Sequence, residues 1–244
     1  MGFYLLLIAL YFETLDELNG VMYINGVAET LQTRKQNLSN NSLERRKRGK
    51  LELRQTILEA AVGLFERQGG FENFSLRQVA EEIGYSPTTI YLHFADKEEL
   101  IFHVALEGFK AFGEQLEAAY THSDDVLLRL RLVGRAYLNF ALENPIHYRL
   151  MFMQRGDFLE RKPPGGQVSV IDSFGILRRA VEAAMKAGAL DPGDPQAVAG
   201  LLWTHVHGVA ALHIATPYFP KEQAEGIFEW SMTVAARGLG ARGL

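Results

Sequence analysis

Apolar residues recur at helical spacing from about residue 53 onward. In the first clear stretch they stand at positions i, i+4, i+7 and i+8, which predicts a helix with one buried stripe: Ile57, Ala61, Leu64 and Phe65. Gly69 and Gly70 follow, and we expect them to end that helix.

A second helix is predicted directly after these glycines. Ser75 and Gln78 form a capping box, in which each side chain satisfies a free backbone N–H of the other residue. Gly84 suits the left-handed position at the helix end. The expected buried positions are Val79, Ala80 and Ile83.

The third predicted helix is short. Ser86 is its N-cap and Pro87 its first residue, where a missing N–H costs nothing. Asp96 and Glu99 form another capping box, so the third helix has only about two turns before a fourth begins. Ile90 and Phe94 are its expected core contacts. The other positions are left on its remaining sides: Thr88, Thr89, Tyr91, Leu92 and His93.

The rest of the chain follows the same helical pattern. We expect further helices over residues 97–120, 126–143, 146–153 and 169–187, with Asn144-Pro145 as a cap. Asp194-Pro195 and Pro220 precede the last two. The period of two that indicates strands is absent, so the predicted fold is all-α.

Composition narrows the functional classes. The 244 residues contain 48% hydrophobic residues and no cysteine, which is typical of a globular protein in a reducing compartment, with the cytoplasm as the default. The net charge of -4 excludes a uniformly basic nucleic-acid binder. A local basic run does occur at 45–54, and it fits either a solvated charge run or a phosphate-binding arm.

Residues 1–48 are interpreted as an amino-terminal extension with a basic end. Its first twelve residues carry no charge, but they are fewer than the roughly 20 apolar residues of a membrane span. They also lack the basic start and cleavage site of a signal peptide, so membrane association is not expected. Met22 is an alternative start residue.

The second and third helices, joined by a tight turn that contains glycine, form a helix-turn-helix pattern. A recognition helix must fit a DNA groove about 12 Å wide and present hydrogen-bonding side chains near its N-terminal end. Threonine suits base edges and thymine methyl groups, whereas Tyr and His more often reach phosphates.

The stretch "ILEAAVGLFERQGGFENFSLRQVAEEIGYSPTTIYLHFADKEEL" resembles the amino-terminal DNA-binding domain of the TetR family of transcriptional regulators. The resemblance covers most of residues 51–111, although Leu92 departs from the aromatic or polar residue often found there. It implies that Ser75, Arg77 and Lys97 contact the DNA backbone. It implies that the following residues enter the major groove: Pro87, Thr88, Thr89, Tyr91 and His93. Structural alternatives are a cap for Ser75 and packing for Tyr91.

The same resemblance implies that residues 112–244 form a helical domain for effector binding and homodimerisation, the latter through the last two long helices. Trp203, His207 and Gly208 resemble the WHG-type carboxy-terminal domain of one branch of the family. Candidate pocket residues, each of which also fits a core position, are Phe109, Phe140, Met151, Phe152, Trp203 and His207. No metal site is expected, because His205 and His207 point to different sides of a helix.

These features favour an effector-released repressor that acts as a homodimer on a palindromic double-stranded operator. An activator, or a small-molecule binding protein with the same fold, is the alternative. The chain has no nucleophile elbow, P-loop, zinc-protease or dinucleotide-binding motif, so neither enzymatic activity nor a cofactor is expected.

Overall fold

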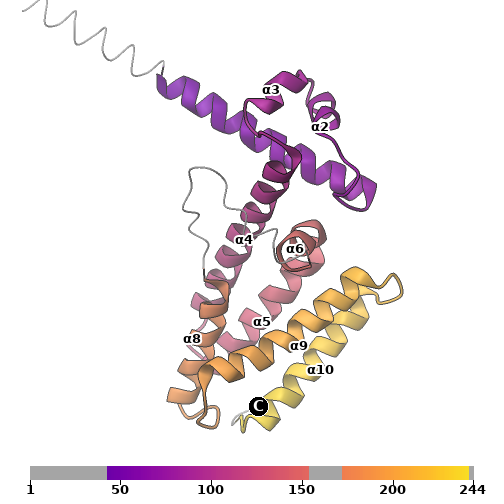
Figure 1. Cartoon of the computed structure of the whole chain (residues 1–244). Coiled ribbons are helices and arrows are strands. Elements are labelled where there is room, and N and C mark those ends of the chain that lie inside the picture. Colours follow the sequence, from indigo (N-terminus) through magenta and orange to yellow (C-terminus); the bar gives the residue numbers. More distant parts are fainter. Residues whose placement is uncertain (1–42, 154–171, 242–244) are drawn as a thin grey trace, which may run out of the picture. The chain divides into compact units, whose positions relative to one another are not determined.

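The computed structural model describes residues 43–153 and 172–241, and every regular element in these two ranges is a helix (Figure 1). The expectation of an all-α fold is confirmed. The chain divides into two compact units, Met1–Thr56 and Ile57–Leu244. Most of the expected extension lies outside the described residues. Its last part, 43–48, already belongs to the first helix, which covers residues 43–68.

The amino-terminal part of the second unit has the expected buried stripe. Ile57, Ala61 and Phe65 are fully buried, and Leu64 is nearly so. The helix ends at Gly69, whose φ of 70° lies in the left-handed region, where glycine pays no Cβ penalty. Two short helices follow, α2 (Leu76–Glu82) and α3 (Pro87–Tyr91).

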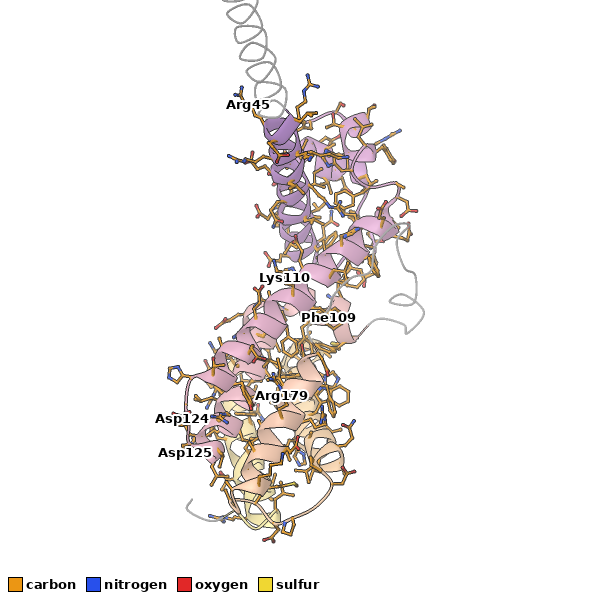
Figure 2. The ribbon with its side chains drawn as sticks, turned by 90° about the vertical axis from the view of Figure 1, so that its left-hand side faces the viewer. Arg45, Phe109, Lys110, Asp124, Asp125 and Arg179 are labelled. Carbon is orange, nitrogen blue, oxygen red and sulfur yellow. The ribbon has the colours of Figure 1, made fainter. Side chains whose placement is uncertain are left out.

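Helix α4 (Lys97–Thr121) begins at the expected cap, where the Glu99 N–H donates to the Asp96 carboxylate at 2.7 Å. It runs without interruption past residue 111, so the expected domain boundary falls inside a helix. Two neighbours on α4, Phe109 and Lys110, differ in environment: Phe109 is half-buried and Lys110 is exposed (Figure 2).

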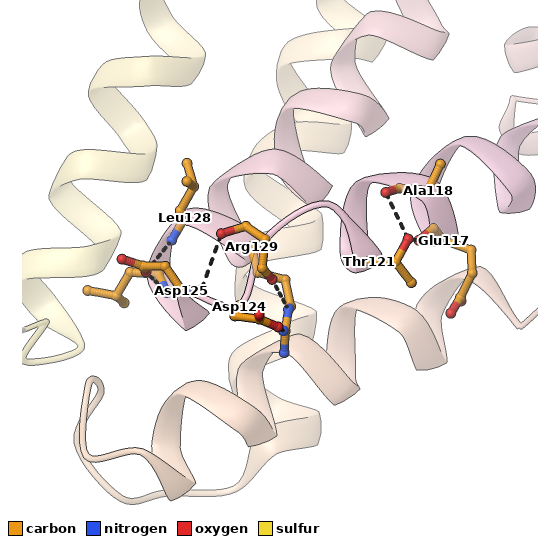
Figure 3. Close-up of polar contacts among 9 residues, drawn as sticks. Glu117, Ala118, Thr121, Asp124, Asp125, Leu128 and Arg129 are labelled. Carbon is orange, nitrogen blue, oxygen red and sulfur yellow. Dashed lines mark hydrogen bonds and ion pairs between the residues drawn. The ribbon is translucent and has the colours of Figure 1, made fainter.

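The turn between α4 and α5 (Val126–Glu143) is fixed by polar contacts (Figure 3). The Thr121 hydroxyl donates back to α4 carbonyls, and the Arg129 Nε donates to the Ser123 carbonyl at 3.0 Å. Asp125 caps α5 by accepting the backbone N–H groups of residues 127 and 128. The two Asp125 bonds satisfy donors that every helix start leaves free.

The remaining helices are α6 (Pro145–Phe152), α8 (Ser173–Lys186), α9 (Pro195–Ala215) and α10 (Lys221–Gly238). Helix α9 packs against α5, α8 and α10, and α4 packs against α5, α6 and α8. The helix expected from residue 169 begins at Ser173, and residues 169–171 lie outside the described part. Asn144 does not cap α6 with its side chain, which donates instead to the Phe140 carbonyl at 3.2 Å.

Helix α9 is unusually apolar. Among the described residues it alone is long and apolar enough, by length and composition, to cross a membrane. Here it contacts three other helices, which bury Ala199, Leu202, Val206, Val209 and Ala210. Leu201 and Leu212 remain 43% and 54% exposed, so none of the described residues covers this side of α9.

Candidate functional site

The pair α2 and α3 is held by the caps expected from the sequence. The Gln78 N–H donates to the Ser75 hydroxyl at 3.3 Å, and the Ser75 N–H donates to the Gln78 side chain at 2.8 Å. Gly84, with φ of 71°, ends α2 in the left-handed region. The Tyr85 N–H then donates to the Ala80 carbonyl at 2.9 Å, which turns the chain directly into α3.

Helix α3 is fixed to the domain by one face. Ile90 is fully buried and Phe94, just beyond the helix, is 1% exposed. The opposite side is open to solvent: Tyr91 is 53% exposed, Leu92 is 73% exposed and Thr88 is exposed as well. A short helix anchored this way can present its outer side chains to a partner without losing its packing.

The predicted DNA-contacting residues fall into two groups. The exposed group comprises Ser75, Arg77, Pro87, Thr88 and Tyr91, of which the last three lie on α3. Thr89, His93 and Lys97 are only half-exposed. The Thr89 hydroxyl also lies 2.9 Å from the Ser86 hydroxyl, and the Lys97 ammonium donates to the Glu72 carbonyl at 3.5 Å. Thr89 and Lys97 therefore also contribute to the local structure.

A cavity of about 910 Å³ lies among α4, α5, α8, α9 and α10. Its wall is mainly apolar and aromatic, with Phe112, Leu177 and Val206 among its members. The volume lies at the upper end of the roughly 300–1,000 Å³ typical of small-molecule sites.

The sequence-predicted pocket residues are only partly brought together. Phe109, Phe152 and Trp203 line the cavity. Phe140 and Met151 do not, and this corrects the expectation: they are 2% and 3% exposed and belong to the packed core. Phe140 lies on a side of α5, and Met151 on a side of α6, that packs against neighbouring helices.

His207 stands behind the cavity wall. Its ring centroid is 5.2 Å from that of Trp203 and 5.8 Å from that of Phe152. Together with Tyr137, Tyr148 and Trp203 it forms a hydrogen-bonded group, here called the tyrosine network. Trp203 Nε1 donates to the Tyr137 hydroxyl at 3.2 Å, which lies 3.1 Å from the Tyr148 hydroxyl. The Tyr148 hydroxyl is 2.6 Å from His207 Nδ1.

The direction of these hydrogen bonds depends on Trp203 and His207, the two ends of the tyrosine network. The indole N–H of Trp203 can only donate, so the two hydroxyl protons need a deprotonated His207 Nδ1 as the final acceptor. The Tyr148 hydroxyl is 2.6 Å from this atom and the Tyr137 hydroxyl 3.1 Å, so we assign the Tyr148 proton to His207 and the Tyr137 proton to Tyr148. Burial lowers the pKa of His207, which favours the neutral ring. Burial raises the pKa of Tyr137 to about 12 and also raises the pKa of Tyr148, so both hydroxyls keep their protons.

Helix α6 connects this network to the loop that precedes α2. Next to Tyr148, the Arg149 guanidinium donates to the Gly69 carbonyl at 2.8 Å and lies 3.5 Å from the Glu72 carboxylate. It also sits 5.5 Å from the centre of the Phe71 ring. Arg149, near the middle of α6, therefore contacts the loop, while Phe152 at the end of the helix lines the cavity.

Large apolar side chains on one side of α9 and one side of α10 are exposed in the described part of the chain. Leu201 and Leu212 share one side of α9; Ile227, Trp230 and Val234 share one side of α10 at i, i+3 and i+7. Trp230 is 70% exposed, which is unusual for so large an apolar residue. We call these five side chains the α9/α10 apolar surface.

Two family models match the chain, one over each functional region. "Bacterial regulatory proteins, tetR family" matches residues 57–104, which include α2 and α3. "Tetracyclin repressor-like, C-terminal domain" matches residues 130–235, which include α9 with Trp203 and His207. The chain belongs to the TetR family.

The chain is also similar to individual proteins and solved structures. An HTH-type transcriptional regulator of Staphylococcus aureus is 35% identical over 97 residues, 38% of this chain and 50% of that protein. The match thus spans about half the length of that relative. A solved structure of a protein with unknown function from Rhodococcus sp. RHA1 has a TM-score of 0.64 at 26% identity, over 78% of this chain and 96% of that one. A Rhodococcus RHA1 regulatory protein in the tetR family has a TM-score of 0.60 at 20% identity, over 78% and 98%.

Sequence reasoning missed three residues that matter to this TetR-family structure. Tyr137 and Tyr148 stand at apolar-periodic positions and are indistinguishable from core residues in the sequence. Arg149 reads as an ordinary surface charge. In each case the partner lies many residues away, so helical periodicity along one element carries no signal of it.

Proposed function

We propose that the protein is a DNA-binding transcriptional regulator, an effector-released repressor that acts as a homodimer on a palindromic operator. The observation that carries this proposal is the outer side of α3. Buried Ile90 and Phe94 anchor the helix, while Thr88, Tyr91 and Leu92 are exposed beside it. In this proposal the protein acts in the cytoplasm.

In this proposal α3 enters the major groove. Thr88, at the second position of the helix, can bring its hydroxyl and methyl groups to base edges. Tyr91 on the same exposed side reaches bases or phosphates. Pro87, Thr89 and His93 border the groove contact. Ser75 and Arg77 at the start of α2, together with Lys97, are assigned to phosphates, which fix the register of the protein on the duplex.

We assign dimerisation to the α9/α10 apolar surface. Helices α9 and α10 pack side by side (Figure 1), and their uncovered apolar side chains include a tryptophan, a residue type enriched at interface centres. A symmetric pair of chains presents two copies of α3, which matches a palindromic operator.

We assign effector binding to the cavity and its transmission to α4 and α6. Phe109 and Phe112 of α4 line the cavity, and α4 begins at Lys97 beside the loop before α2. Phe152 of α6 lines it as well, and Arg149 holds the Gly69 carbonyl of that loop. An effector that alters how α4 and α6 pack can release DNA only if it binds the two arrangements with different affinity.

Selection from a random double-stranded DNA library tests the proposal. The full chain should enrich one palindromic sequence, with each half-site contacted by one α3. Enrichment of a sequence without two-fold symmetry would contradict the dimer arrangement. If no sequence is enriched over several rounds, the assignment as a specific DNA-binding regulator is wrong.

A further inference from the structure

The wall of the cavity is dominated by aromatic and aliphatic side chains. Phe109, Phe112 and Leu116 of α4 face it, as do Leu177 of α8 and Val206 of α9. Such a wall favours apolar ligand surface, because apolar groups gain from leaving water and charged groups lose their hydration.

The polar atoms in the aromatic part of the wall already have protein partners. Trp203 Nε1 donates to the Tyr137 hydroxyl, and the Tyr137 proton is directed to the other members of the tyrosine network. A ligand that needed a hydrogen-bond donor from either residue would have to break this network. The inner wall therefore offers shape and apolar contact in place of a polar recognition point.

The charged lining residues are also paired. Arg131 forms an ion pair with Glu229 at 2.7 Å, and Glu229 makes a second ion pair with Arg135. Asp125 caps α5, and Asp172 accepts the Gly175 N–H at 2.8 Å to cap α8. Glu229 shares its single negative charge between these two arginines, but with Asp125 and Asp172 the carboxylates at this wall still outnumber them. An anionic ligand would therefore meet a net negative charge among the described lining residues and their ion-pair partners.

We propose that the occupant of this cavity is an uncharged, predominantly apolar or aromatic small molecule. As a statement about the effector, this inference rests on the function proposed above. As a statement about what the cavity binds, it depends only on the residues that line the cavity. The class excludes carboxylates, phosphates and sulfonates as tight ligands.

Two matched fluorescent probes test the proposal on the unmodified chain. N-phenyl-1-naphthylamine is neutral, and 8-anilino-1-naphthalenesulfonate is the same ring system with one added sulfonate. We expect the neutral probe to bind saturably and the anion to bind at least about tenfold more weakly. Equal or tighter binding of the anion, tighter binding of the cationic dye rhodamine 6G, or no saturable binding of the neutral probe would each overturn the proposal.

A variant locates the binding. Ala236 lines the cavity, so Ala236→Phe should fill part of the cavity and weaken the binding of the neutral probe about tenfold or more. The matched control is Ala118→Phe, an exposed position on α4 outside the cavity, which should leave the affinity unchanged. Equal affinity in Ala236→Phe and the unmodified chain would place the probe elsewhere and overturn the assignment. These titrations contain no DNA. If the protein failed to bind any operator, the proposed function would be refuted, but the probe affinities and the conclusion about the cavity would not change.

Discussion

Within the tyrosine network, Tyr137→Phe should destabilise the protein more than Tyr148→Phe. Without the Tyr148 hydroxyl, Tyr137 can turn its proton to His207 Nδ1, 3.1 Å away, and still accept from Trp203. One hydrogen bond is lost, which costs about 1 kcal/mol of unfolding free energy. Without the Tyr137 hydroxyl, Tyr148 still donates to His207, but two hydrogen bonds disappear and the Trp203 N–H loses its acceptor. We expect a loss of roughly 2–3 kcal/mol.

Urea unfolding, followed by circular dichroism at one protein concentration, measures both losses, since the stability of a dimer depends on concentration. Tyr218→Phe is the matched control, because Tyr218 is 91% exposed and should change stability by less than about 0.5 kcal/mol. An equal loss in the two network variants, or a larger loss in Tyr148→Phe, would refute the role of Tyr137 as the acceptor for Trp203 and the centre of the network.

Three further predictions follow from the same geometry. Burial lowers the pKa of His207 from 6.5, so the unfolded chain binds the proton more readily. Unfolding free energy should then fall as pH drops below about 6.5 and less steeply in His207→Gln; an unchanged slope would contradict this. Trp230→Glu should convert the proposed dimer into a folded monomer in sedimentation velocity, and a persistent dimer would exclude the α9/α10 apolar surface as the interface. Lys97→Ala should weaken binding to all DNA sequences alike and reduce the salt slope by about one unit per subunit, whereas an unchanged slope would remove Lys97 from the phosphate contacts.

Local signals predicted the amino-terminal part of the fold well. The caps at Ser75, Ser86 and Asp96 and the turn at Gly84 each depend on residues a few positions apart, and each stands where the sequence indicates. A cap needs only its own backbone neighbours. Asn144 is the exception, because its side-chain amide donates to the Phe140 carbonyl, which also accepts the Asn144 backbone N–H.

The carboxy-terminal site could not be predicted to the same depth. Phe140 and Phe152 look alike in the sequence, yet one packs in the core and the other lines the cavity. Helical periodicity indicates that a side chain faces inward, but it does not indicate which other helix the side chain contacts. The tyrosine network joins residues of α5, α6 and α9, so only the packing of three helices brings them together.

The central claim is that the exposed side of α3 reads a specific DNA sequence. Fluorescence anisotropy with the selected duplex and a scrambled duplex, at one salt concentration, tests it directly. The unmodified chain should prefer the selected duplex by about 1,000-fold or more. Thr88→Ala combined with Tyr91→Ala should lose most of that preference and keep most of its affinity for scrambled DNA. If the double variant keeps the full preference, α3 is not the recognition helix and the account of the site is contradicted.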